Sequence, residues 1–162
     1  MKRIAVIMFI LGMCAYTNSQ INPRTIGLRL GGGSINSLEF SYQHKLKEAN
    51  RLEADLALGF GYWSGNYYSS ISFGGIYHWV WNITEGLNWY VGPGAMVGLT
   101  SSSTNSSVNL GIGGQIGIEY DFNDYKLPLL ISLDTRPMWD FIGRYGDFGW
   151  GAALGIRYIW NK

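Results

Sequence analysis

Apolar and polar side chains alternate along most of the chain, in eight stretches separated by short polar segments. A repeat of two residues is typical of a β-strand whose two faces meet different surroundings. In the clearest stretch, Ile112, Ile116 and Ile118 alternate with glycine and polar side chains. The pattern predicts eight strands, which cover residues 24–31, 37–45, 51–63, 69–82, 87–99, 107–122, 127–139 and 148–160.

The two faces of the predicted strands differ in size as well as in polarity. One face is bulky and apolar, as in Leu56, Leu58 and Phe60, whereas the other is small and polar and carries charges. A water-soluble barrel places its large apolar residues inside, so this arrangement favours a barrel with lipid on its outside. The stretches match the ~9–11 residues that a tilted strand needs to cross a membrane, and bacterial barrels have even strand numbers. We therefore predict an all-β fold, an eight-stranded antiparallel up-and-down transmembrane β-barrel.

Charged residues on the small face are predicted to form a luminal charge network. An unpaired charge away from water is costly, so we expect these groups to pair, and water or a shared proton to balance the excess of acids. The network is either a structural core or a path for protons or ions. Inward glycines either leave a ligand pocket or make room for side chains that reach across the lumen, namely Tyr90, Met96, Arg136 and Met138. The predicted luminal charges are Arg29, Glu39, Glu53, Asp55, Glu119, Asp121, Asp134, Arg136 and Arg157.

Aromatic residues test the prediction independently. If the N-terminus lies in the periplasm, the aromatic residues sort into two groups with aliphatic residues between them, as in the aromatic girdles of membrane barrels. The predicted periplasmic girdle comprises Tyr42, Trp79, Trp81, Trp89, Tyr120, Phe122, Tyr158 and Trp160. The predicted outer girdle comprises Phe60, Tyr62, Phe73, Trp139, Phe148 and Trp150.

Short polar segments join the predicted strands. Turn-forming residues at 47–50, 84–86 and 123–126 predict periplasmic turns, and segments 32–36, 65–68, 100–106 and 140–147 predict outer loops. If the barrel has a surface partner, its contacts are expected on these loops, although the sequence does not identify that partner. The candidate contact residues are Tyr67, Tyr68, Arg144 and Tyr145.

The N-terminus has the pattern of a secretory signal peptide. Two basic residues precede an apolar run over 4–16, and small residues follow at 17–19. We predict that residues 1–19 are removed and that residues 20–162 form the barrel. The alternatives are an anchor that is retained and a lipoprotein modified at Cys14, for which Met13 is too large in the preceding position.

Composition narrows the function classes. Only 14% of residues are charged, against about 25% in an average soluble domain, while mean hydropathy is only +0.02. These values do not fit a helical membrane protein. A net charge of +1 gives no electrostatic reason to expect nucleic acid as a partner. The only cysteine, Cys14, lies in the leader, so we expect no disulfide, no cysteine metal site and no cofactor.

Three stretches carry a resemblance to a known group of proteins. Residues 117–122, 128–137 and 155–158 resemble small barrels of the OmpX/OmpA-transmembrane group, of a type common in Bacteroidetes. The resemblance implies an outer-membrane protein of a Gram-negative cell, in contact with lipid and lipopolysaccharide and delivered by the barrel-insertion machinery. Such barrels usually end on an aromatic residue, whereas here Asn161 and Lys162 follow Trp160.

The resulting functional expectation is a non-catalytic outer-membrane barrel with a structural or surface-interaction role. One alternative is an enzyme that modifies membrane lipid, which needs serine, histidine and an acid within hydrogen-bond reach. Of the two histidines, His44 faces outward without an adjacent serine, and His78 faces inward. The other alternative is a narrow channel or binder for a small solute, because eight strands enclose little space.

Overall fold

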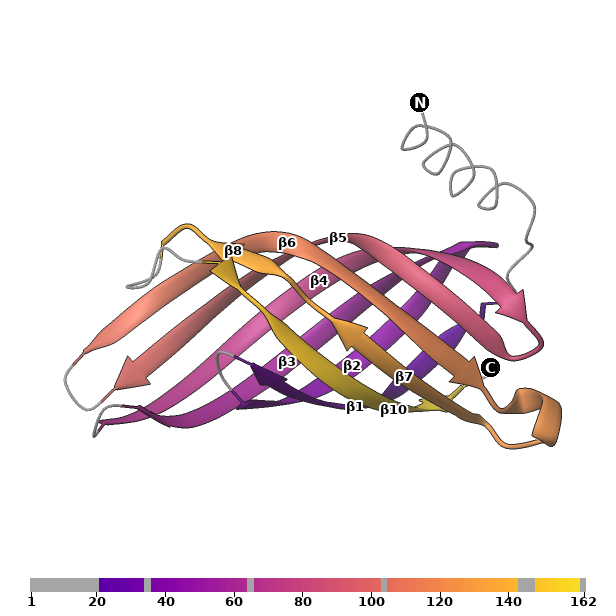
Figure 1. Cartoon of the computed structure of the whole chain (residues 1–162), viewed down its shortest axis with the longest axis horizontal. Coiled ribbons are helices and arrows are strands. Elements are labelled where there is room, and N and C mark those ends of the chain that lie inside the picture. Colours follow the sequence, from indigo (N-terminus) through magenta and orange to yellow (C-terminus); the bar gives the residue numbers. More distant parts are fainter. Residues whose placement is uncertain (1–20, 34–35, 64–65, 103–104, 143–147, 161–162) are drawn as a thin grey trace, which may run out of the picture.

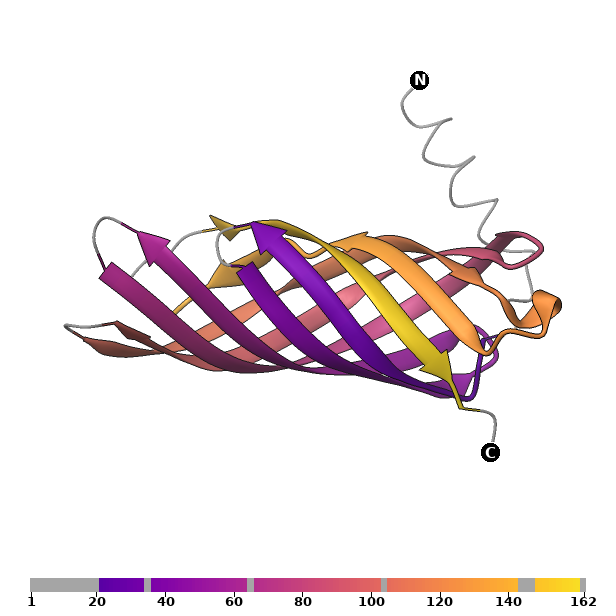
Figure 2. The same ribbon diagram turned by 90° about the horizontal axis from the view of Figure 1, so that it is seen from below.

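The computed structural model describes residues 21–33, 36–63, 66–102, 105–142 and 148–160. Every strand pairs antiparallel with its neighbours, and the sheet closes on itself where β1 pairs with β10 (Figures 1 and 2). The strands are β1 Arg24–Gly33, β2 Asn36–Lys47, β3 Asn50–Trp63, β4 Asn66–Thr84, β5 Leu87–Ser102, β6 Ser106–Asp121, β7 Leu129–Thr135, β8 Met138–Asp140, β9 Phe148–Gly149 and β10 Gly151–Ile159.

These ten segments make an eight-stranded ring. β7 and β8 together form the seventh strand, because both pair with β6, and β9 and β10 together form the eighth. The predicted fold class, an eight-stranded antiparallel up-and-down barrel, is confirmed. Among the described residues, no helix is long and apolar enough to span a membrane.

The predicted seventh strand is continuous, whereas the observed one is interrupted at Arg136 and Pro137. Proline has no backbone N–H and cannot donate to a strand ladder. The pairing survives because the Gly114 amide donates to the Pro137 carbonyl at 3.0 Å. A second proline, Pro93, lies opposite Gly114 on the other side of β6.

Burial is inverted relative to a water-soluble protein. Among the described residues, sixteen polar or charged side chains are buried, against nine apolar ones. The outward positions carry large apolar side chains, such as Leu28, Ile112 and Leu133, that are roughly half exposed. The closed sheet satisfies its own backbone groups, so such a surface is compatible with lipid.

The two ends of the barrel differ in their connections. At one end, which we call the turn end, short segments join the strands: Glu48–Ala49, Glu85–Gly86 and a single turn of 3-10 helix, η1 (Asn123–Tyr125). Gly86 has a φ of 73°, and an added Cβ would lie 2.8 Å from the Asp121 carbonyl oxygen, so glycine suits this turn. β1 begins at the same end, where Arg24 pairs with His44 and the Lys45 amide donates to the Pro23 carbonyl at 3.0 Å.

At the opposite end, which we call the loop end, strands replace much of the predicted loops. The β3–β4 ladder continues to the Tyr62–Tyr67 and Trp63–Asn66 pairs, and the β5–β6 ladder continues to Ser101–Ser106. The predicted loops at 65–68 and 100–106 are therefore too long, because backbone pairing outweighs the low strand preference of Ser, Gly and Asn. Figure 1 shows these two hairpins reaching furthest at the loop end.

Candidate functional site

The interior of the turn-end half is filled by one connected network of charged and polar side chains. Its centre is Glu53 on β3, which is fully buried. One Glu53 oxygen accepts from Gln43 Nε2 at 2.5 Å and from Arg157 Nη2 at 3.2 Å, and the other accepts from Arg136 Nη2 at 3.1 Å. Arg157 also donates to the hydroxyls of Ser41 and Ser132, at 3.0 and 2.7 Å. One carboxylate thereby holds arginines from the seventh and eighth strands.

A second part of the network surrounds Arg29 on β1. Its guanidinium binds Asp134 through Nε and Nη2, and Nη1 donates to Glu39 Oε2 at 2.6 Å. Glu39 also accepts from Arg136 Nη1 at 3.1 Å, which joins this part to Glu53. The Tyr90 hydroxyl donates to Asp134 at 3.2 Å. All of these side chains are buried, so the charges are compensated by each other rather than by solvent.

The third part lies nearest the turn end. Arg51 binds both oxygens of Glu119, at 2.8 and 2.7 Å, and its Nε donates to His78 Nδ1 at 3.2 Å. Because Nδ1 accepts, the ring proton lies on Nε2, 3.3 Å from the Gln115 side-chain oxygen. The Arg51 guanidinium also lies 4.7 Å from the centre of the Tyr90 ring, within the range of a cation–π contact.

Four buried atoms of the network have no hydrogen-bond partner within the described residues. Two of them, Arg51 Nη2 and Glu119 Oε2, form an ion pair with each other at 2.7 Å, and the other two are Asp55 Oδ1 and Arg136 Nε. The other atoms of both groups are engaged, since Arg136 Nη2 donates to Asp55 Oδ2 at 2.5 Å. Asp55 is the last charged residue on β3 towards the loop end, whereas on the seventh strand Arg136 is followed by Met138 and then by Asp140, whose Oδ1 accepts from the Leu110 amide at 3.2 Å. Asp55 and Arg136 mark the boundary of the buried ionic network.

Beyond that boundary the inward residues of β3 and β6 are small and uncharged. Passing towards the loop end, β3 continues inward with Gly59 and Gly61, and β6 continues with Gly111 and Asn109. An added Cβ at Gly61 would meet nothing within 4 Å. The interior is therefore open at Gly61, and most inward side chains of the loop-end half are partly exposed, whereas those of the network are buried.

The structure brings eight of the nine predicted luminal charges together in this network. Asp121 stands apart: it is half-buried at the turn end, where its carboxylate accepts from Asn22 Nδ2 at 2.6 Å and from the Asn123 amide at 2.8 Å. The prediction omitted Arg51, although that residue shares the parity of Glu53 and Asp55 on the same strand. With Arg51 included, four arginines face five carboxylates, so the excess of acid is smaller than the sequence suggested.

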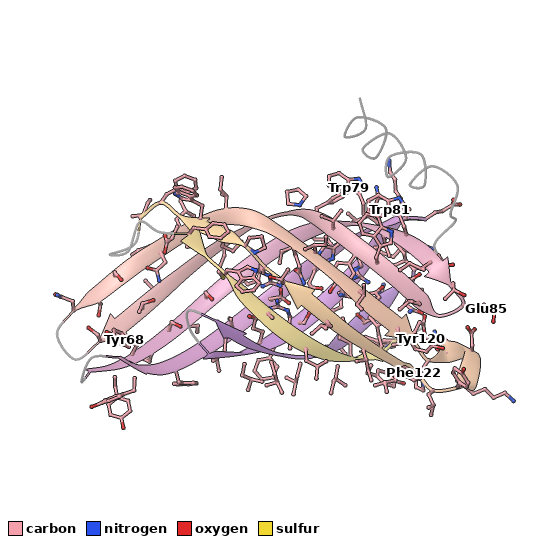
Figure 3. All side chains as sticks on the ribbon, in the orientation of Figure 1. Tyr68, Trp79, Trp81, Glu85, Tyr120 and Phe122 are labelled. Carbon is pink, nitrogen blue, oxygen red and sulfur yellow. The ribbon has the colours of Figure 1, made fainter. Side chains whose placement is uncertain are left out.

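The predicted girdle residues lie on the outward face or at its rims. Figure 3 places Trp79, Trp81, Tyr120 and Phe122 towards the turn end and Tyr68 at the loop end. Several pack against a neighbour on the same face: Trp81 stacks on Trp89 with ring centres 4.4 Å apart, and Tyr120 meets Phe122 edge to face at 4.7 Å. At the loop end Phe60, Tyr62, Phe73, Trp139, Phe148 and Trp150 are exposed, as are Tyr42, Trp79, Tyr158 and Trp160 at the turn end. The Arg24 guanidinium lies over the Trp160 ring, 6.0 Å from its centre.

Of the four predicted contact residues, Tyr67 and Tyr68 lie within β4 rather than in a loop, because the β3–β4 pairing extends past them. Arg144 and Tyr145 lie outside the described residues. His44 is exposed on the outer face, where its ring stacks near Tyr42, and His78 is buried in the network. The two histidines are therefore on opposite sides of the barrel wall.

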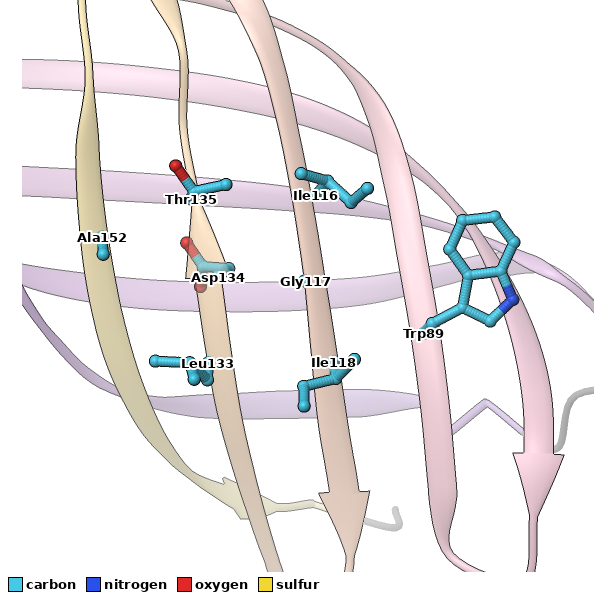
Figure 4. A pocket seen from close by; sticks show the side chains of 8 residues that line it. All are labelled: Trp89, Ile116, Gly117, Ile118, Leu133, Asp134, Thr135 and Ala152. Carbon is cyan, nitrogen blue, oxygen red and sulfur yellow. The ribbon is translucent and has the colours of Figure 1, made fainter.

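A shallow hollow interrupts the outer face over β6, β7 and β10 (Figure 4). It forms because the small Thr135 and Ala152 lie between larger outward residues, including Ile116 and Leu133. The Thr135 hydroxyl donates to the Gly151 carbonyl at 2.9 Å, so its polarity is already satisfied. The Asp134 carboxylate points away from the hollow to Arg29 inside the barrel. The hollow is apolar and holds no chemically active group.

A closed ring of eight antiparallel strands with an apolar outside and an ionic inside defines the fold of small outer-membrane β-barrels. Several solved structures of such barrels are similar to this chain. Neisserial surface protein A matches with a TM-score of 0.64 and 14% identity, over 85% of this chain and 94% of that one. The N-terminal β-barrel domain of Pseudomonas aeruginosa OprF matches with a TM-score of 0.55 and 17% identity, over 83% and 95%.

A third similar structure is Ail, the attachment invasion locus protein of Yersinia pestis, with a TM-score of 0.50 and 11% identity, over 85% of this chain and 99% of that one. At sequence identities this low, the structural similarity establishes a shared fold and nothing more. No protein-family model matches the chain. No curated protein matches it by sequence either.

Proposed function

We propose that this chain is an integral outer-membrane barrel without catalytic activity, whose role is structural or depends on contacts made by its loop end. The observation that carries the proposal is the inverted burial, with a polar, charged interior inside a closed ring and large apolar side chains outside. In water that outer surface would be an aggregation hazard. In lipid it is the surface that the hydrophobic effect requires.

The network supports a closed lumen rather than a channel. Arginines from β1, β3 and the seventh and eighth strands converge on carboxylates from β2, β3, β6 and β7, and their bonds cross the interior. An ion moving through would have to displace several charge-assisted hydrogen bonds, which are the strong ones. A narrow solute conductor is therefore the weaker candidate.

Lipid-modifying catalysis has less support. Within the described residues, His78 is bound by Arg51 and Gln115, so neither ring nitrogen faces a serine. His44 lies on the outer face with Tyr42 as its ring neighbour. A nucleophile needs a base within hydrogen-bond reach, and neither histidine provides one.

The proposal includes the finer assignments that the sequence suggested. Residues 1–19 act as a signal peptide that is removed after export, and the host is a Gram-negative cell, of the Bacteroidetes type by resemblance. The outward apolar band contacts phospholipid and lipopolysaccharide, and the barrel-insertion machinery delivers the chain. A surface partner, which the sequence does not identify, engages the loop end.

The first test is localisation together with gel mobility. The full chain is produced in a Gram-negative host, the envelope is fractionated, and samples are run with and without boiling. We expect the protein in the outer-membrane fraction, with faster migration when unboiled and an N-terminus near residue 20. Recovery from the soluble periplasm without a mobility shift would refute the proposal.

Two further assays separate the alternatives. Purified barrel in planar bilayers should give no steady single-channel current, and a reproducible current would favour the conductor. Incubation with defined lipid A should release no product, and release that depends on His44 would favour the enzyme. His78→Gln is the matched control, because it changes the buried histidine while leaving the outer face untouched.

A further inference from the structure

The four strands that reach furthest at the loop end form a continuous sheet tip. We define the β3–β6 tip as residues 59–63, 66–70, 100–102 and 105–107. Its rows are fixed by pairing: Gly61 pairs with Tyr68, Tyr68 with Ser102, and the next inward row runs Gly59, Ser70, Thr100 and Ser107. The tip is therefore a single surface made from two hairpins.

The outer face shows where the apolar band ends. The row Leu58, Ile71, Leu99 and Val108 is wholly aliphatic, and the next outward row reads Phe60, Ser69, Ser101 and Ser106. Three aliphatic side chains thus give way to three exposed hydroxyls within two residues. If the chain spans a membrane as proposed above, this change marks the lipid boundary and the tip projects into water.

We propose that the inward face of the β3–β6 tip is a docking surface for an uncharged oligosaccharide, an inference that rests on the proposed membrane placement. Charge is the first reason. Residues 58–71 and 98–109 contain no Asp, Glu, Lys, Arg or His. The turn end, by contrast, carries Lys45, Lys47, Glu48, Glu85 and Lys126. A charged ligand would lose its hydration at the tip without gaining a counter-charge from these two segments.

Hydrogen-bonding chemistry is the second reason. The inward face presents the hydroxyls of Ser70, Thr100 and Ser107, which both donate and accept, and the amide of Asn109 beside them. Asn109 Nδ2 donates to the Thr100 hydroxyl oxygen at 2.5 Å, which orients that hydroxyl to donate onward. Sugar hydroxyls also both donate and accept hydrogen bonds, so a neutral sugar can form hydrogen bonds with such a surface in several orientations.

Shape and the aromatic ring are the third reason. Tyr68 is half-buried on the inward face, and a tyrosine ring can lie against the apolar face of a sugar. Opposite, Gly59 and Gly61 add no side chain, and the direction of a Cβ at Gly61 is open for 4 Å. Because this face points to the barrel axis, contact with lipid cannot account for its composition.

Binding is tested on the full chain in nanodiscs, after gel mobility has shown that the barrel is folded. The probes are the neutral oligosaccharides cellohexaose, maltohexaose and chitohexaose, with a heparin hexasaccharide as the anionic comparison. We expect saturable binding of at least one neutral probe and none of heparin. Tyr68→Ala should weaken it at least tenfold, and Thr100→Val about threefold.

The matched control is Tyr125→Ala, which removes an exposed tyrosine at the turn end and should leave binding unchanged. Should Tyr68→Ala fail to fold, Thr100→Val combined with Ser107→Ala tests the same face. A folded barrel that binds no neutral probe, prefers heparin, or is indifferent to both tip variants overturns the inference while the proposed function stands. A chain that shows no mobility shift and is absent from the outer membrane refutes the proposed function instead.

Discussion

The two halves of this barrel solve the problem of a narrow interior in opposite ways. The turn-end half is filled by Glu53, Arg157 and their partners, which are buried and mutually bonded. The loop-end half is lined mainly by glycine, serine and threonine, and most of its inward residues are partly exposed. One fold thereby combines a buried, mutually bonded ionic core with an end whose inward residues are partly exposed. Stability should depend on the first half, and interaction on the second.

The largest effect is expected from Glu53→Ala. Removing this carboxylate leaves Arg136 and Arg157 without a shared partner in the interior, and breaking a buried pair costs about 3–5 kcal/mol. Urea titration of the barrel in lipid vesicles should show a loss of that size in the free energy of unfolding. A loss below about 1 kcal/mol would mean that the network does not hold the barrel together.

The next effect depends on depth in the lipid. Leu56→Arg, at the level of the network, should cost about 2–4 kcal/mol, because the guanidinium would meet hydrocarbon. Leu99→Arg lies in the last aliphatic row and should cost about 0–1 kcal/mol, as near a membrane interface. The same titration measures both variants. Equal costs at the two positions would contradict the lipid boundary placed at that row.

A smaller difference in stability is expected between glycine-to-alanine variants in the two halves. At Gly92 an added Cβ would lie 1.6 Å from the Tyr77 carbonyl oxygen, so Gly92→Ala must push β4 and β5 apart, at about 1–3 kcal/mol. Gly61→Ala meets open space and should change stability by less than about 0.5 kcal/mol. Comparing the unfolding midpoints of the two variants checks this, and the reverse order would refute it.

The smallest effect is expected from single hydroxyls. Ser101→Ala removes an exposed hydroxyl that lies 3.1 Å from Ser106, and should change stability by less than about 0.5 kcal/mol. Ser41→Ala removes the buried acceptor of Arg157 Nε and should cost about 1.5 kcal/mol, typical for a bond to a charged group. A cost at Ser101 equal to that at Ser41 would show that the tip is part of the stable core.

Much of this arrangement could be predicted from the sequence alone. Lipid outside the barrel and a narrow interior require apolar and polar side chains to alternate at every second residue along each strand. That repeat gives the strand number and assigns side chains such as Leu110 and Arg157 to opposite faces. It cannot give the pairing inside the barrel. Arg29 and Asp134 are 105 residues apart, and only the register of the closed ring brings them together.

The strand ends were also beyond reach of the sequence. Serine and asparagine favour turns locally, so the run around residue 103 reads as a loop, whereas pairing across β5 and β6 keeps it extended to Ser101 and Ser106. Pro137 interrupts the seventh strand without changing its register, because β6 still supplies the Gly114 amide. In both cases neighbouring strands, rather than local preference, decide the conformation.

Arg157 has a consequence for how the ring comes to be closed. Its partner Ser132 lies on the neighbouring β7, but Ser41 and Glu53 lie across the seam between β10 and β1. An open sheet inserting strand by strand would leave this guanidinium short of two partners until the final seam forms. Closure of the ring at the β1–β10 seam and completion of the ionic core therefore occur together. A partly closed ring lacks the bonds from Arg157 to Ser41 and Glu53. The same bonds oppose lateral opening afterwards, so lipid has no easy route sideways into the lumen.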